Sequence, residues 1–502
     1  MGLKAALSKP FAKAVVKKNR QWIENPIESQ LATFKSLIEQ AKETSFGQDH
    51  DFQNIQTIKD FQSKVKVQSY EGLKGYIDRM VEGEEDVLWP GKPLYWSKTS
   101  GTTSGAKYIP ISKESIDHHV ETARNALLHY IHETGNSDFV NGKMIFLQGS
   151  PEMEEKNGIK VGRLSGIVAH YVPGYLLKNR LPSMEVNCIE DWEEKVDAIS
   201  KETINERMTL IGGIPPWVQM YFERLLALSG KEQIKDLFPD YSLFVWGGVN
   251  FQPYKAVFDK LVGKKVSSIE SYPASEGFIA FQDSQVEPGL LLNLDAGIFF
   301  EFIPVAEFHD ENPSRLTLAD VKVGVNYVII LNTNAGLWGY NIGDTVEFVS
   351  TYPFKIKVTG RIKHFTSAFG EHVIAKEVEQ AMNKAIENEG GEVVEFHVAP
   401  QVNPADGLPY HEWFVEFAKE PNNIENFKKQ IESEMRSQNP YYDDLISGSI
   451  LRPFELTKVN KDGFKLYMKS IGKLGGQNKT PRLANDRKIA DALIEKNLVH
   501  VK

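Results

Sequence analysis

The apolar positions of the chain follow two different periods, and the change from one to the other outlines the expected elements. Near the N-terminus apolar residues recur at helical spacing, at Ile27, Leu31, Phe34, Leu37, Ile38 and Ala41. This period predicts that residues 1 to about 45 are helical. Residues 60–90 have the pattern of short helices joined by turns.

The middle of the chain alternates short apolar runs with longer amphipathic stretches. The runs cover residues 143–147, 210–211 and 243–246, and the stretches cover 192–208 and 217–228. This alternation of strands and helices predicts a largely parallel α/β core. From about residue 290, strand-like runs follow one another with only short turns, which predicts an antiparallel β region. Residues 371–502 mix both patterns, as in a small α+β domain.

Composition narrows the class of protein. The 502 residues are 41% hydrophobic and 25% charged, which is enough for two domains. A net charge of −9 argues against general affinity for nucleic acids or anionic membranes. The single Cys188 excludes an intramolecular disulfide and a multi-cysteine metal site, and it fits a reducing, cytoplasmic setting. No apolar run approaches the ~18 residues of a membrane helix, and the Lys-rich N-terminus is expected to be an amphipathic helix packed on the body.

One segment is suited to binding phosphate. Residues 97–107, Ser-Lys-Thr-Ser-Gly-Thr-Thr-Ser-Gly-Ala-Lys, contain six hydroxyl-bearing residues, two Gly and two Lys. Such a loop presents backbone N–H groups, hydroxyls and a cation to polyphosphate oxygens. It is not a Walker A loop, because Ala106 replaces the second Gly and Tyr108 follows Lys107. Extended flanks predict that it joins two strands, and taken alone it is equally well explained as a polar hairpin tip.

Two later fragments change that balance, because all three follow in a set order. They are Tyr272-Pro-Ala-Ser-Glu-Gly277 and Tyr340-Asn-Ile-Gly-Asp344. The order S-G-T-T-S-G-x-K, Y-x-x-S-E-G, Y-x-x-G-D resembles the adenylate-forming superfamily of acyl ligases and luciferases. Within it the chain resembles the auxin-responsive acyl-acid amido synthetases, through fragments at residues 41–47, 95–96, 246–250, 369–373 and 475–482. The resemblance therefore covers nearly the whole chain.

The resemblance implies a domain plan and a nucleotide site. Residues 1–358 would bind ATP and the acyl acid, residues 359–363 would be a hinge, and residues 364–502 would form a mobile C-terminal lid. The residues that would contact the nucleotide are Ser100, Gly101, Thr102, Thr103, Ser104, Lys107, Gly247, Gly248, Tyr272, Ser275, Asp344 and Arg361. Among these, Gly247 and Gly248 would let the adenine approach the backbone, because glycine has no side chain.

The same resemblance implies individual roles, each of which has a plainer alternative. Glu276 would coordinate Mg²⁺ near the α-phosphate, or it is a solvated turn carboxylate. Tyr272 would stack on adenine, or it belongs to the core. Asp344 would accept hydrogen bonds from the ribose hydroxyls, or it is an ordinary turn aspartate before a strand. Arg361, at the hinge, would contact the ribose or an acidic partner.

A basic stretch near the C-terminus contains the expected catalytic lysine. Residues 458–488 hold nine Lys or Arg and two acidic residues, and most of these cations are expected on a solvated face. The Gly-rich segment 475–482 resembles the family's lysine segment, which contacts the reacting carboxylate and the α-phosphate. Lys479 is the residue we assign to that role, with Lys473 as the alternative. His118 and His119 are expected to be surface or core residues, because adjacent helical positions cannot chelate one metal.

Together these expectations describe an ATP-dependent ligase. The enzyme would adenylate a carboxylic acid and transfer the acyl group to an amine, expected to be an amino acid, releasing AMP and pyrophosphate. It would use ATP and Mg²⁺ and small-molecule substrates, bind no nucleic acid and no membrane, and be a monomer or weak homo-oligomer. An acyl-CoA ligase and a nucleotide-binding relative without turnover remain alternatives. The sequence names neither the acid nor the amine.

Overall fold

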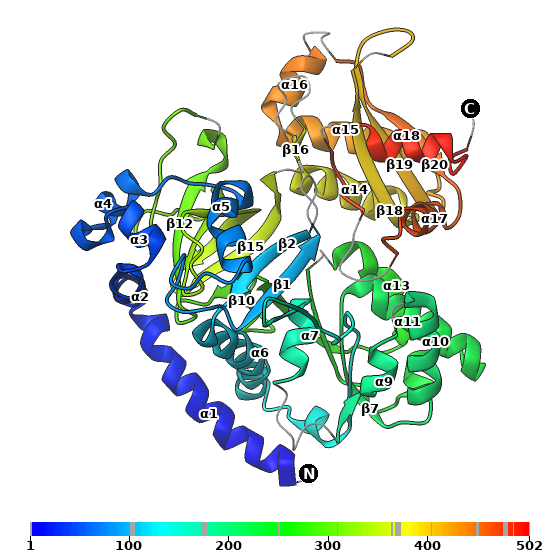
Figure 1. Ribbon diagram of the computed structural model, residues 1–502. Helices are drawn as coiled ribbons and strands as arrows, with labels where there is room; N and C mark the ends of the chain where they lie inside the picture. The colour runs from blue at the N-terminus through cyan, green and yellow to red at the C-terminus, as the bar shows by residue number, and fades with distance from the viewer. Residues whose placement is uncertain are drawn as a thin grey trace. The chain divides into compact units, whose positions relative to one another are not determined.

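The computed structural model describes residues 3–100, 106–171, 178–189, 191–248, 251–308, 310–362, 365–366, 373–402, 404–447, 451–474, 480–484 and 486–500. The chain folds into two compact units (Figure 1). The larger unit comprises Met1–Val249 and Leu261–Val358, and the smaller comprises Asn250–Lys260 and Thr359–Lys502.

An 11-stranded sheet forms the centre of the larger unit, in the order β12-β13-β14-β15-β11-β10-β9-β8-β7-β3-β6. Its strands are β3 (Lys143–Phe146), β6 (Arg180–Leu181), β7 (Met208–Gly212), β8 (Leu243–Gly247), β9 (Ser267–Ala274), β10 (Gly277–Phe281), β11 (Leu290–Leu292), β12 (Ile298–Pro304), β13 (Asn326–Thr333), β14 (Tyr340–Thr351) and β15 (Phe354–Arg361). Strands β6, β3, β7, β8 and β9 pair in parallel. Strand β10 pairs antiparallel with both β9 and β11, and β13 pairs antiparallel with both β12 and β14. The expected parallel core and antiparallel region are therefore both confirmed, as two halves of one sheet.

A smaller four-stranded sheet in this unit carries the polar loop. Its order is β2-β1-β5-β4, from β1 (Tyr95–Ser100), β2 (Ala106–Ile111), β4 (Glu154–Lys156) and β5 (Ile159–Gly162). Strands β1 and β2 pair antiparallel from Tyr95 with Ile111 to Ser100 with Ala106. The prediction that the loop joins two strands is confirmed.

Helices cover the strands of the larger unit. They are α1 (Leu3–Glu24), α2 (Pro26–Ala41), α3 (Ser45–Asp49), η1 (Phe52–Asn54), α4 (Ile58–Lys64), α5 (Tyr70–Val81), α6 (Lys113–Thr134), η2 (Asp138–Asn141), α7 (Leu164–Ala169), α9 (Met184–Asn187), α10 (Trp192–Thr203), α11 (Pro215–Ser229), α12 (Ile234–Leu237) and η3 (Val305–Glu307). Helix α6 packs on β9 and β10, and the expected N-terminal helix α1 packs on α6. Ser112 caps α6 by accepting the Ser115 N–H, and Gly135 ends the helix at φ +69°. No described helix has the length and apolar character needed to cross a bilayer.

The smaller unit is α+β, as the sequence predicts. Its three-stranded sheet has the order β18-β19-β20, and the short pair β16-β17 precedes it. The strands are β16 (Phe365–Thr366), β17 (Val373–Ile374), β18 (Glu392–Gln401), β19 (Tyr410–Lys419) and β20 (Glu455–Val459). The helices are α13 (Gln252–Val262), most of which belongs to this unit, α14 (Ala375–Glu389), α15 (Ile424–Gln438), α16 (Pro440–Ser447), α17 (Gly463–Ser470) and α18 (Lys488–Glu495).

Candidate active site

The turn between β9 and β10 places Ser275 and Glu276 at the carboxyl end of β9. Only these two residues join the antiparallel strands. The Ser97 hydroxyl on β1 donates to Ser275 Oγ at 2.8 Å, and the Tyr340 hydroxyl on β14 donates to Glu276 Oε1 at 3.2 Å. Segments from three distant parts of the sequence therefore meet at one turn, which is half-buried at both residues.

Asp344 lies inside β14, so the alternative that it is an ordinary turn aspartate before a strand is wrong. The pairing of β13 with β14 shifts between Val328–Thr345 and Ile330–Asn341, so β14 carries extra residues there. Gly343, at φ +89°, sits in this bulge. Bulges bend a strand and re-aim a side chain, and glycine adopts positive φ without steric cost. The motif's Gly-Asp pair therefore marks a break in strand register.

Asp344 and Tyr272 form a buried pair. The Tyr272 hydroxyl donates to Asp344 Oδ2 at 2.6 Å, and the two residues are 9% and 8% exposed. The Tyr272 ring belongs to the main hydrophobic core of the larger unit. The two residues expected at adenine and ribose are thus held next to each other, with the carboxylate oriented by a hydroxyl on the neighbouring half of the sheet.

The polar loop is described only at its ends. Ser100 is the last residue of β1, and Gly101, Thr102, Thr103 and Ser104 lie outside the described residues, as does the side chain of Ser100. Lys107, on β2, places its ammonium 5.3 Å from the centre of the Tyr70 ring. The Tyr70 hydroxyl also accepts the backbone N–H of Tyr108 at 3.0 Å. Tyr70 of α5 therefore contacts β2 at two successive residues, Lys107 and Tyr108.

Gly247 ends β8 and Gly248 follows it, at the same edge of the sheet as the β9–β10 turn. A Cβ on Gly247 would lie 2.2 Å from the carbonyl oxygen of Ser271, so a side chain does not fit there. Gly248 has φ +77°. Close approach of two strands and positive φ are both reasons for glycine. On the adjacent strand, burial raises the pKa of Glu270 to about 7.

The residues expected in the smaller unit are only partly described. Arg361 ends β15, and its side chain lies outside the described residues, as does the whole of Lys479. Lys473 follows α17, where its N–H donates to Met468 O at 2.9 Å.

The residues after Lys479 are firmly held. Burial lowers the pKa of His397 to about 4, and its Nδ1 lies 2.6 Å from Pro481 O.

Arg482 also holds the segment after Lys479 in place, and Pro481 and Arg482 are together called the anchor. Arg482 Nε donates to Glu395 Oε1 at 3.1 Å and its Nη1 to Glu379 Oε1 at 3.2 Å. Its backbone oxygen accepts the Val398 N–H of β18 at 2.8 Å. The chain three residues beyond Lys479 is therefore fixed to the sheet and to α14 of the smaller unit.

The sequence reasoning missed two residues that hydrogen-bond the candidate site residues. Ser97 and Tyr340 make the hydrogen bonds to Ser275 and Glu276, yet neither had been assigned a role. Tyr340 opens the Y-x-x-G-D fragment, which was the one available signal. Ser97 opens the polar loop, but nothing in its pattern indicates a contact with a residue 178 positions away.

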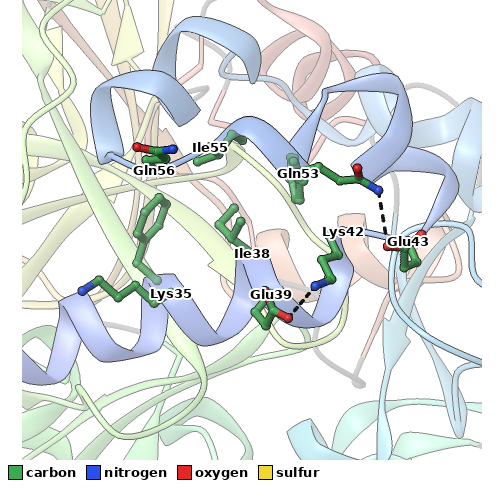
Figure 2. A pocket seen from close by; sticks show the side chains of 10 residues that line it. Lys35, Ile38, Glu39, Lys42, Glu43, Gln53, Ile55 and Gln56 are labelled. Carbon is green, nitrogen blue, oxygen red and sulfur yellow. Dashed lines mark hydrogen bonds and ion pairs between the residues drawn. The ribbon is translucent and has the colours of Figure 1, made fainter.

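A pocket of about 570 Å³ lies elsewhere on the larger unit, lined by residues of α2, by Lys42 and Glu43, and by the segment 52–56. Figure 2 shows the side chains that line it. Its rim carries the ion pair of Lys42 with Glu39, at 2.6 Å. Its lining includes none of the residues predicted to contact substrate or nucleotide. This cavity is therefore separate from the candidate active site.

The donor set at the turn fits Mg²⁺. Glu276 supplies a hard carboxylate oxygen, and Tyr340 already donates a hydrogen bond to it. Mg²⁺ is commonly bound by one or two carboxylates together with substrate phosphates and water. Among the described residues no group of three or more His, Cys, Asp or Glu is arranged to hold a metal by protein ligands alone. A single carboxylate facing a bound polyphosphate is consistent with this chemistry.

Comparisons with known proteins agree over most of the chain. Residues 15–180 and 175–266 match the GH3 family N-terminal domain, 291–361 the GH3 family central domain and 376–488 the GH3 family C-terminal domain. The indole-3-acetic acid-amido synthetase GH3.3 of Arabidopsis thaliana is 20% identical, over 92% of this chain and 90% of that protein. The jasmonoyl–L-amino acid synthetase JAR4 of Nicotiana attenuata is 22% identical, over 63% of this chain, and the match spans 65% of that relative's length.

Solved structures share the fold. The GH3.15 acyl acid amido synthetase matches with a TM-score of 0.80 and 15% identity, over 97% of both chains. A 2-hydroxyisobutyryl-CoA ligase in the postadenylation state matches with a TM-score of 0.56 and 12% identity, over 93% of this chain and 91% of that one. The α/β architecture is thus that of adenylate-forming enzymes. Since family models match nearly the whole sequence, from the first helices to the last sheet, the chain belongs to the GH3 family.

Proposed function

We propose that this protein is an ATP-dependent acyl-acid amido synthetase. The observation that supports it most directly is the convergence of the motifs. Glu276 with Tyr340, Ser275 with Ser97, and Asp344 with Tyr272 are joined by hydrogen bonds within one unit. The names of relatives in the same family, amido synthetases acting on jasmonate and indole-3-acetic acid, support the same reaction class.

In the first step a carboxylate oxygen of the acid attacks the α-phosphorus of ATP. The bond from that phosphorus to the bridging oxygen breaks, and pyrophosphate leaves with the electron pair. Hydroxyl and N–H donors of residues 100–104, with the Lys107 ammonium, would stabilise the charge that develops on the leaving group. Mg²⁺ held by Glu276 would supply electrostatic stabilisation of the phosphate oxygens. Asp344 would orient the ribose by accepting hydrogen bonds from its hydroxyl groups.

In the second step an amine nitrogen would attack the carbonyl carbon of the acyl-adenylate. The bond from that carbon to the phosphate oxygen breaks, AMP leaves with the electron pair, and the nitrogen releases a proton to solvent as the amide forms. Lys479 would act in the first step, by contacting the reacting carboxylate and α-phosphate. Residues 359–363, with Arg361, would serve as the hinge about which the C-terminal domain turns between the two steps. The anchor of Pro481 and Arg482 would give the Lys479 segment a fixed point on that domain.

A screen with purified protein tests the function. ATP, Mg²⁺ and a panel of carboxylic acids are combined, and acid-dependent pyrophosphate release is measured with pooled amino acids, with CoA, or with neither. We expect AMP and amide to form with amino acids and not with CoA, and Glu276→Gln to remove the signal. Thioester formation with CoA would instead make the protein an acyl-CoA ligase. Absence of acid-dependent exchange of pyrophosphate into ATP would refute the proposal.

A further inference from the structure

A buried histidine of α6 has no hydrogen-bond partner in the part of the chain that the structure describes. His119 is 2% exposed, and neither ring nitrogen has a hydrogen-bond partner among the described residues. His129, ten residues later on the same helix and 6% exposed, places Nε2 3.0 Å from Asn19 Nδ2. Buried polar groups are almost always hydrogen-bonded, because leaving one unpaired costs stability. A buried imidazole of this kind is a candidate for contact with a bound ligand.

The way α6 packs along β10 places His119 near the candidate active site. The His129 ring lies 5.2 Å from the Phe281 ring, near the end of β10. Nearer the start of the helix, Thr122 Oγ1 accepts from Asn293 Nδ2 at 2.7 Å, and the same nitrogen lies 3.4 Å from Phe278 O. Helix and strand therefore run in the same direction. A rise of about 1.5 Å per residue carries His119 about 4.5 Å beyond Thr122, toward the beginning of β10 and the Glu276 turn.

Two more polar atoms, in α7 and in the segment that follows β3, are also buried and unpaired among the described residues. They are Nε2 of Gln148, which follows β3, and Oγ of Ser165 in α7. A Cβ on Gly149 would lie 3.6 Å from Ser165 Oγ, so the two segments are neighbours. Ile116 of α6, one turn before His119, shares a hydrophobic cluster with Leu164 of α7. The three unpaired groups therefore belong to neighbouring elements, namely α6, α7 and the segment that follows β3.

All three groups lie toward one edge of the sheet. Strands β3, β7, β8 and β9 are parallel, so the residues that follow β3 and those that follow β9 leave the sheet at the same edge. Ligands of open α/β sheets bind outside this edge. The hydrophobic cluster of α6 and α7 also includes Tyr95 and Tyr171. An apolar wall with a few polar atoms is the usual composition of a small-molecule site.

We propose that His119, Gln148 and Ser165 hydrogen-bond a hydroxyl or keto oxygen that the acyl acid carries away from its carboxylate. This inference rests on the proposed function and specifies its substrate class as oxygen-substituted carboxylic acids. Burial, with the nearby His118, lowers the pKa of His119 to about 4, so the ring is neutral near pH 7. A neutral imidazole offers one donor and one acceptor, a side-chain amide nitrogen donates, and a hydroxyl does both. These donors and acceptors can all bond a hydroxyl group, whereas a hydrocarbon tail would leave them unpaired.

The test compares acids that differ by one hydroxyl. The probes are benzoic and para-hydroxybenzoic acid, phenylacetic and para-hydroxyphenylacetic acid, and hexanoic and omega-hydroxyhexanoic acid, each assayed by exchange of pyrophosphate into ATP. We expect kcat/KM to favour the hydroxylated member of at least one pair by roughly 100-fold or more, because a site built around a hydroxyl rejects the analogue that lacks it. His119→Leu should reduce that preference to below about tenfold, whereas His129→Leu should retain it.

Thermal unfolding of the same variants without substrate gives a second readout. Replacing an unpaired buried polar group by an apolar one of similar volume is neutral or stabilising. His119→Leu should therefore keep or raise Tm, whereas His129→Leu, which loses the Asn19 contact, should lower it. Equal losses of Tm would mean that His119 has a structural partner such as an internal water, and would overturn the inference. Exchange without any hydroxyl preference would overturn it too while leaving the proposed function intact, whereas no exchange with any acid would count against both.

Discussion

Replacing Asp344 by Ala should weaken ATP binding strongly while the fold is kept. A hydrogen bond to a charged group contributes about 1.5–3 kcal/mol. If the carboxylate accepts both ribose hydroxyls, the loss is about 3–6 kcal/mol, which corresponds to a rise in Kd of about 10²- to 10⁴-fold. Asp344→Asn should fall between the parent and the Ala variant, because the amide keeps one acceptor oxygen and loses the charge.

The Tyr272 hydroxyl supplies the control, because it donates to the same carboxylate at 2.6 Å. Tyr272→Phe removes this bond but keeps the ring and the charge of Asp344. It should destabilise the protein by about 1–3 kcal/mol, measured by urea unfolding, since a buried carboxylate loses a donor. Its effect on ATP affinity should be much smaller than that of Asp344→Ala. Both variants should therefore lose stability, because both break the buried pair. Only Asp344→Ala should lose much ATP affinity, and this difference measures the binding role of Asp344.

Isothermal titration calorimetry of folded protein with ATP and Mg²⁺ measures the binding term directly. Circular dichroism before each titration establishes that the variant is folded. An unchanged Kd for Asp344→Ala would refute the ribose assignment. An equal rise in Kd for Asp344→Ala and Tyr272→Phe would also refute it, because the effect would then come from the disturbed β14 bulge and not from a lost contact with ribose.

Three further outcomes are expected. Glu276→Gln should keep Tm within a few degrees and abolish pyrophosphate exchange into ATP; exchange at the parental rate would remove Glu276 as the metal ligand. Lys479→Ala should slow adenylation greatly with little change in ATP affinity, and slow amide formation from synthetic acyl-adenylate much less; if Lys473→Ala alone shows this pattern, the role belongs to Lys473. Burial raises the pKa of Glu270 from 4.5 to about 7, so between these values the folded state binds a proton that the unfolded chain has lost, and stability falls as pH rises. Glu270→Gln should flatten that decline in urea unfolding followed from pH 4.5 to 7, and an unchanged slope would contradict the raised pKa.

Local pattern was sufficient for the elements and for the identity of most candidate residues. The helical period of Phe34, Leu37 and Ile38 produces α2, whose buried face contains all three. The extended flanks of the polar loop became β1 and β2. Such features depend on neighbours three or four residues away in a helix, or on alternation in a strand, so the sequence carries them. The order of three short motifs likewise identified the family before any geometry was available.

Contacts between distant segments needed the tertiary structure. Whether the parallel and antiparallel regions form one sheet depends on the pairing of β11 with both β10 and β15, which are far apart in sequence. The same holds for the bulge at Asp344, since a shift of register exists only relative to the partner strand β13. The hydrogen bond of Tyr340 with Glu276, and the absence of one at His119 among the described residues, follow from how helices and strands pack. Local propensity specifies which elements form, whereas the burial of their faces against one another decides which side chains meet.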